Sequence, residues 1–199
     1  MSQLTADRKV SVFTFTTSRI VTAAVLVALT IILGLVPGIG FIPLPNATGS
    51  ATIEHIPTIL GSVLEGPLVG MVTGLTFGLL SFTRATTPLF RDPLVSVAPR
   101  IIIGLTPWIV FVALKRIQLD FAAGAAGFVG SATNTILVLA IAIWRGYLPL
   151  AIVPLVLPQA IAEAVLATIL TIVITRAVYI TRNQILRAPD RKKREDLPY

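Results

Sequence analysis

The strongest constraint on this chain is a succession of apolar segments, each close to the length of a membrane-crossing helix. About 17 to 25 residues of helix span the roughly 30 Å of bilayer hydrocarbon, and Gly, Pro and charged residues divide the apolar sequence into pieces near that length. Hydrophobic residues make up 55% of the chain and charged residues 13%, with a mean hydropathy of +0.89. These values exclude an ordinary soluble domain. The sequence therefore predicts an integral membrane protein built from helices, without the alternation of a β-barrel.

We expect an all-α integral membrane protein with six transmembrane helices in one domain. The expected helices cover residues 20–36, 51–64, 67–82, 97–114, 121–144 and 150–180. This domain, residues 20–180, follows an N-terminal segment of residues 1–19 and precedes a basic tail of residues 181–199. Lys and Arg concentrate at both ends and in the link between the fourth and fifth helices, so the positive-inside rule predicts cytoplasmic termini. No signal peptide is expected. The basic tail suits lipid headgroups better than nucleic acid.

Residues 51–100 hold the expected packing centre. A turn of about three residues, Glu65 to Pro67, must make the second and third helices antiparallel. Gly70, Gly74 and Gly78 are four apart, so they line one helix face and admit a neighbouring backbone. We expect the polar ends around this hairpin to bind a ligand.

The segment of residues 37–50 is predicted to fold over the helix ends as a lid. Three prolines, three glycines and an asparagine exclude regular helix. Apolar side chains such as Phe41 would not be retained in a simple polar linker. Phe41 is therefore a candidate ligand contact.

Four polar residues inside apolar helices are candidate binding residues. Arg100 lies in the first turn of the fourth helix, where it either reaches the interface or meets an anion. Asn134 continues the four-residue spacing of Ala122, Ala126 and Gly130, which places it on a packed face. Gln159 and Glu163 lie one turn apart on the sixth helix. A buried Glu must pair, be protonated or contact a polar ligand, and an ion pair with Arg100 is the structural alternative.

Arg84 and His55 are weaker candidates. Arg84 lies in the loop of residues 83–96 together with Phe90, Arg91 and Asp92, a mixture that offers charge and apolar contact. His55 follows Glu54 near the outer end of the second helix, and a lone histidine is more often structural than a ligand. With one His and no Cys, the chain excludes a multi-histidine metal site, a thiolate metal site and disulfides.

Taken together, these features resemble a substrate-binding S component of an energy-coupling-factor (ECF) vitamin transporter. The resemblance rests on the small-residue pair Ala24 and Ala28, on the Pro-rich outer loop, and on the blocks HIPTILGSVLEGPLVGMVTGLTFGLLS and DPLVSVAPRIIIG. It implies capture of a vitamin from outside by a subunit in a prokaryotic plasma membrane. It also implies that the Ala24 and Ala28 face docks on an EcfT-like membrane coupling subunit, although such pairs more often pack internally.

The same resemblance implies two cytoplasmic ATPase subunits that drive the S component to topple and release its vitamin inward. The chain itself contains no G-x-x-x-x-G-K-[ST] segment for ATP. It has no H-E-x-x-H or G-x-S-x-G motif either, so we expect neither an enzyme nor a bound cofactor.

Pantothenate is the favoured vitamin, with cobalamin also compatible. An arginine, Arg100 or Arg84, would pair with the carboxylate, and the amide and carboxyl side chains on the last two helices would meet its hydroxyl and amide groups. Riboflavin or folate would favour more aromatic residues than the 7% present, of which Phe41, Phe90 and Trp144 are best placed.

Two other classes of protein remain open. A stand-alone secondary transporter would use Glu163 for proton coupling, although no inverted repeat is visible. A structural membrane subunit would bind no small molecule.

Overall fold

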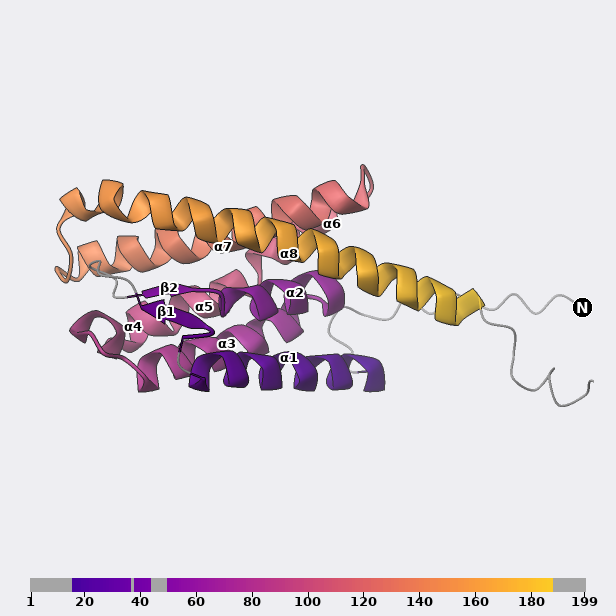
Figure 1. Cartoon of the computed structure of the whole chain (residues 1–199), viewed down its shortest axis with the longest axis horizontal. Helices are drawn as coiled ribbons and strands as arrows, with labels where there is room; N and C mark the ends of the chain where they lie inside the picture. The colour runs from indigo at the N-terminus through magenta and orange to yellow at the C-terminus, as the bar shows by residue number, and fades with distance from the viewer. Residues whose placement is uncertain (1–15, 37, 44–49, 188–199) are drawn as a thin grey trace, which may run out of the picture.

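The computed structural model describes residues 16–36, 38–43 and 50–187, with residues 41–43, 50 and 183–187 described by backbone alone. The elements in chain order are α1 (Thr17–Leu35), β1 (Phe41–Pro43), β2 (Ser50–Thr52), α2 (His55–Glu65), α3 (Pro67–Thr83), η1 (Pro88–Arg91), α4 (Pro93–Ser96), α5 (Ala98–Ile103), α6 (Thr106–Leu114), α7 (Leu119–Trp144), η2 (Leu150–Ile152) and α8 (Val153–Arg187). Figure 1 shows an elongated bundle, with α1 along one long side, α7 and α8 along the other, and α2 and α3 between them.

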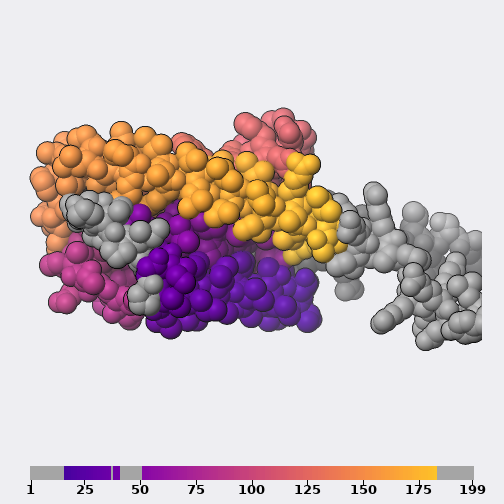
Figure 2. Space-filling view, in the orientation of Figure 1, coloured from indigo at the N-terminus to yellow at the C-terminus, as the bar shows by residue number. Residues whose placement is uncertain are grey.

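Among the described residues, four stretches are long and apolar enough to cross a membrane, judged by length and composition. They are Thr17–Leu35, Pro93–Leu114, Leu119–Trp144 and Leu150–Arg182, and the apolar helix α3 is shorter. In Figure 2, α1 (indigo) and α8 (orange to yellow) form the two long flanks of the molecule. Large apolar side chains such as Val25 and Leu155 are exposed on these helices. Their exposure suits contact with lipid, because an apolar surface of this extent is unfavourable in water.

Helix α2 lies at the centre of the bundle. Every residue of α2 except Leu64 is buried. Its Ile59 packs against α7 so closely that a methyl group on Gly130 would lie 2.6 Å from the Ile59 Cγ1 atom. The predicted small-residue face of α7 is likewise inside, since Ala122, Ala126 and Asn134 are buried.

The glycine face of α3 packs against the backbone of α5. A Cβ atom on Gly70 would lie 2.5 Å from the carbonyl oxygen of Gly104, and one on Gly74 would lie 2.1 Å from the carbonyl oxygen of Arg100. Any side chain at these positions would push the two helices apart. The spacing therefore works as predicted, and the neighbour that it admits is α5.

The prediction of a single helix over residues 97–114 is wrong. The chain instead forms α4, α5 and α6, with a break after Ile103. Pro107, in the first turn of α6, has no N–H group to bond the carbonyl of Ile103, so a continuous helix would lose a hydrogen bond there. The Gly104 carbonyl accepts a hydrogen bond from the Ser62 hydroxyl of α2 at 2.7 Å.

The second helix begins later than the expected residue 51. Residues 50–52 form β2, which pairs antiparallel with β1 in the register Phe41 to Thr52. Strand β1 lies within the segment of residues 37–50 predicted to be a lid, and β2 begins at the last residue of that segment. Residues 44–49 lie outside the described residues. Pro57 falls in the first turn of α2, where a missing N–H costs little.

The sixth predicted helix is longer than expected. Helix α8 begins at Val153, contains Pro158, and continues through residue 181 to Arg187. In Figure 1 its C-terminal end projects past the neighbouring helices. Helical structure therefore extends into the segment predicted as a basic tail.

Replacing Gly74 with alanine is expected to destabilise the fold. The new methyl carbon would lie 2.1 Å from a backbone oxygen of α5, and overpacking of this kind costs about 1 to 3 kcal/mol. Thermal unfolding in detergent measures the loss. Gly61→Ala is the matched control, because its methyl group would meet only side-chain atoms at 3.3 Å or more. Equal losses for both variants would contradict the close α3–α5 contact.

Candidate functional site

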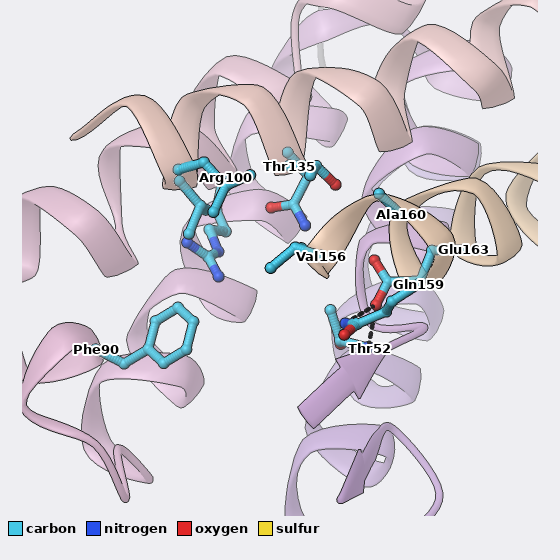
Figure 3. A pocket seen from close by; sticks show the side chains of 11 residues that line it. Thr52, Phe90, Arg100, Thr135, Val156, Gln159, Ala160 and Glu163 are labelled. Atoms are coloured by element: carbon cyan, nitrogen blue, oxygen red, sulfur yellow. Dashed lines mark hydrogen bonds between the residues drawn. The ribbon is translucent and has the colours of Figure 1, made fainter. Parts of the chain in front are cut away.

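A small cavity lies near the β1–β2 end of the bundle, where β2, η1, α5, α7 and α8 meet. Its lining residues are Thr52, Phe90, Arg100, Asn134, Thr135, Val138, Leu139, Val156, Gln159, Ala160 and Glu163. Figure 3 shows Arg100 and Phe90 on one side, with Thr52, Gln159 and Glu163 on the other. The cavity has a volume of about 50 Å³, enough for a few water molecules.

Arg100 supplies a buried positive charge to this cavity. Only 2% of the residue is exposed, and its Nη1 atom donates a hydrogen bond to the Val95 carbonyl at 2.6 Å. The guanidinium carbon lies 5.0 Å from the ring centroid of Phe77 and 5.5 Å from that of Phe90, which is within cation–π range. Its Nε atom has no hydrogen-bond partner among the described residues. The group therefore retains donor capacity for an anion.

Glu163 is held on the opposite side of the cavity by two donors. Its Oε1 atom accepts hydrogen bonds from the Thr52 backbone N–H at 2.9 Å and from Gln159 Nε2 at 2.8 Å. The possible ion pair between Arg100 and Glu163 is absent from the described part of the chain, although the two charges do interact electrostatically. Glu163 thus links β2 to α8.

Asn134 completes the polar lining from α7. It is 5% exposed, and its Oδ1 atom has no hydrogen-bond partner within the described residues. Val138, Leu139 and Val156 supply apolar wall beside it. A cation, amides, a carboxylate and apolar surface therefore converge on one space, as in sites for small polar molecules.

The structure brings four predicted binding residues together and places the others elsewhere. Arg100, Asn134, Gln159 and Glu163 all line the cavity. His55 is fully buried in α2 and is not among the lining residues, and Arg84 is exposed at the end of α3. Phe41 lies in β1, and its side chain lies outside the part of the chain that is described.

Ala24 and Ala28 are exposed on α1. The buried residues of this helix, Leu26, Thr30 and Gly34, follow the same four-residue spacing on another face. Packing among the described residues therefore does not explain the alanine pair.

Sequence reasoning missed Thr52 and Thr135 as lining residues. Thr52 was expected in a helix, but it lies in β2, and the hydrogen bond from its N–H to Glu163 joins residues 111 positions apart. No local signal marks such a contact. A cluster of three or more metal-ligating side chains does not occur among the described residues.

A second polar cluster lies beside the cavity and outside its lining. Asp92 Oδ2 accepts hydrogen bonds from Arg145 Nε at 2.9 Å and Tyr147 Oη at 3.3 Å, and Oδ1 accepts one from the Leu94 N–H at 2.9 Å. The Leu94 N–H and the paired Arg145 lower the pKa of the Asp92 carboxyl below its usual value, although burial opposes this. Asp92 thereby caps α4 and joins it to the turn after α7.

Comparison with known proteins identifies the family. A family model described as ECF transporter, substrate-specific component, matches residues 18–175. The chain therefore belongs to the ECF transporter substrate-specific components, a family of transporter subunits rather than enzymes. This agrees with the resemblance inferred from the sequence.

One relative and one solved structure extend this comparison. The pantothenic acid transporter PanT of Lactococcus lactis subsp. cremoris (strain MG1363) is 32% identical over 159 residues, covering 66% of this chain and 79% of the relative. A structure described as the S component of a bacterial ECF transporter superposes with a TM-score of 0.59 at 18% identity, covering 82% of this chain and 96% of that one. The superposition on this solved structure supports the fold of the chain.

The lowered pKa of Asp92 predicts a pH-dependent contribution to stability. The ionised carboxylate stabilises the fold fully above the ordinary Asp pKa of about 3.9, and this contribution is lost as the pH falls through the lower pKa of the folded state. Wild-type protein should therefore unfold at a higher temperature than Asp92→Asn at pH 7, and the difference should shrink below about pH 4. A difference that stays constant down to pH 3 would contradict the assignment.

Proposed function

We propose that this chain captures pantothenate at the cavity around Arg100, as the vitamin-binding subunit of an ATP-driven uptake system. The observation that supports this best is a buried guanidinium that lines the cavity without an ion pair among the described residues. Pantothenate carries one carboxylate, one amide and two hydroxyl groups. A relative named as a pantothenic acid transporter supports the same choice of vitamin.

The charged and amide side chains of the cavity each have a role in this proposal. Arg100 pairs with the carboxylate, because a charge-assisted hydrogen bond from a guanidinium is strong in a low-dielectric site. Asn134 and Gln159 form hydrogen bonds with the amide and hydroxyl groups of pantothenate, and Glu163 accepts a hydrogen bond from one of its hydroxyl groups. Pockets for small molecules usually measure roughly 300 to 1,000 Å³, against about 50 Å³ here. The walls must therefore move apart to admit the vitamin.

The rest of the proposal concerns the membrane and the partners. The vitamin enters from outside, both termini are cytoplasmic, and the protein lies in a prokaryotic plasma membrane. The exposed pair Ala24 and Ala28 meets a membrane coupling subunit, and two cytoplasmic ATPases supply the energy. Small residues that face outward from a membrane helix permit close approach of another helix, which supports this docking face.

The first test is to purify the chain alone in detergent, denature it, and identify released small molecules by mass spectrometry. Stoichiometric pantothenate would support the proposal. Another vitamin would support capture and correct the substrate. An empty protein that also fails to bind a panel of vitamins would contradict capture and favour a structural subunit, whereas uptake by the chain alone would favour a secondary transporter.

Removing the charge of Arg100 is expected to weaken pantothenate binding strongly. A hydrogen bond to a charged group contributes about 1.5 to 3 kcal/mol, so Arg100→Gln should raise the Kd by about 10- to 100-fold. Isothermal titration calorimetry measures this change. Arg84→Gln, at the exposed end of α3, is the comparison variant and should bind almost normally. If Arg84→Gln lost affinity and Arg100→Gln did not, the carboxylate would be assigned to Arg84.

A bulky side chain on the exposed alanine face should separate uptake from binding. Ala28→Leu is expected to abolish uptake by the assembled transporter while the Kd for pantothenate stays unchanged, because α1 contributes none of the lining residues of the cavity. Ala140→Leu on α7 adds the same bulk at another exposed alanine and serves as control. Normal uptake by Ala28→Leu would argue against docking through this face.

A further inference from the structure

The Asp92 cluster consists of Asp92, Arg145 and Tyr147. It connects the exposed surface of the bundle to the cavity through a short chain of contacts. Arg145 and Tyr147 follow α7, and both donate hydrogen bonds to the Asp92 carboxylate. The side chain of Asp92 is 6% exposed, whereas that of Arg145 is 47% exposed. The cluster therefore fixes a nearly buried acid to a turn that lies 53 residues further along the chain.

Asp92 also fixes the backbone of α4. Its carboxylate caps the helix at the Leu94 N–H, and its carbonyl accepts from the N–H groups of Val95 at 3.1 Å and Ser96 at 3.0 Å. A helix of four residues has no stability of its own, because helix nucleation is unfavourable. The geometry of α4 therefore depends on this cap and on its tertiary contacts.

Helix α4 in turn places two parts of the cavity wall. The Val95 carbonyl accepts the hydrogen bond from Arg100 Nη1 at 2.6 Å. The Ser96 hydroxyl donates to the carbonyl of Phe90, whose ring lies 5.5 Å from the Arg100 guanidinium carbon. Asp92 does not line the cavity, yet one turn of helix joins it to the residues that orient the guanidinium.

We propose that Asp92, held by Arg145 and Tyr147, is a positioning residue that orients Arg100 toward the carboxylate of the ligand. This inference rests on the proposed function, in which Arg100 binds that carboxylate. An arginine side chain has many rotamers, so affinity improves when the protein fixes the guanidinium before the ligand arrives. The cluster sets selectivity for an acid over its uncharged analogue without touching either.

The test compares pantothenate with pantothenol, in which a hydroxymethyl group replaces the carboxylate. Calorimetry gives the Kd of each compound for wild-type protein, Asp92→Ala and Arg100→Gln. Asp92→Ala is expected to weaken pantothenate binding by about tenfold, which is about 1.4 kcal/mol, and pantothenol binding by less than about twofold. The ratio of the two affinities should fall toward that of Arg100→Gln. The double variant that combines Asp92→Ala with Arg100→Gln should be no less selective than Arg100→Gln alone, because both changes act on the contact between Arg100 and the carboxylate of the ligand.

Milder variants separate positioning from loss of fold. Asp92→Asn retains an N-cap side chain and loses the charge, so its selectivity should lie between wild-type and Asp92→Ala. Arg145→Lys should retain more selectivity than Arg145→Gln, because lysine keeps the positive charge that pairs with the Asp92 carboxylate. Asp120→Ala removes the other carboxylate paired at 2.9 Å, with Arg176, and should leave both affinities unchanged.

A purely structural role would give a different result. Equal weakening of both compounds by Asp92→Ala, or an unchanged ratio in the folded Asp92→Asn and Arg145→Gln variants, would overturn the inference while leaving capture of pantothenate intact. Wild-type protein that binds the two compounds equally would overturn it as well. Wild-type protein that binds neither would refute the proposed function, and this inference with it.

Discussion

The close contact between α3 and α5 is the constraint on which the rest of the site depends. Because Gly74 lacks a side chain, α3 approaches the backbone at Arg100 to a distance that no other residue would allow. The same helix supplies Phe77, whose ring faces the guanidinium. The glycine spacing of α3 therefore decides where the charge of the cavity lies, and the α2–α3 hairpin holds that arrangement at the centre of the bundle.

Burial gives the two charged residues of the cavity different roles. Glu163 already accepts two hydrogen bonds from the protein, so its position is set by β2 and by Gln159. Arg100 has one carbonyl and two aromatic faces around it and interacts electrostatically with Glu54 and Glu163, but it makes no direct ion pair among the described residues. This difference underlies the proposal that Arg100 pairs with an anion, whereas Glu163 connects β2 to α8 on the opposite wall.

The sequence predicted the helices that have a strong periodic signal and failed where tertiary contacts override local pattern. Helices near residues 67–82 and 121–144 were predicted almost to their ends. The fourth helix was expected to be continuous because the segment is apolar throughout, although Pro107 cannot donate a hydrogen bond to the Ile103 carbonyl. At the break, the Gly104 carbonyl accepts a hydrogen bond from Ser62 of α2, a tertiary contact that the sequence does not show. The strand containing Thr52 was predicted as helix because the local sequence does not reveal its pairing with β1.

Composition and spacing by themselves determined that this is a helical membrane protein, which faces of its helices are small, and which polar residues are too costly to leave in lipid. They singled out Arg100, Asn134, Gln159 and Glu163, because an unpaired polar group in an apolar helix needs a partner. The tertiary structure decided that these four share one cavity and that Arg84 and His55 do not line it. It also decided the link from Asp92 to Arg145. Such contacts join residues far apart in the chain, so their geometry exists only once the helices have packed.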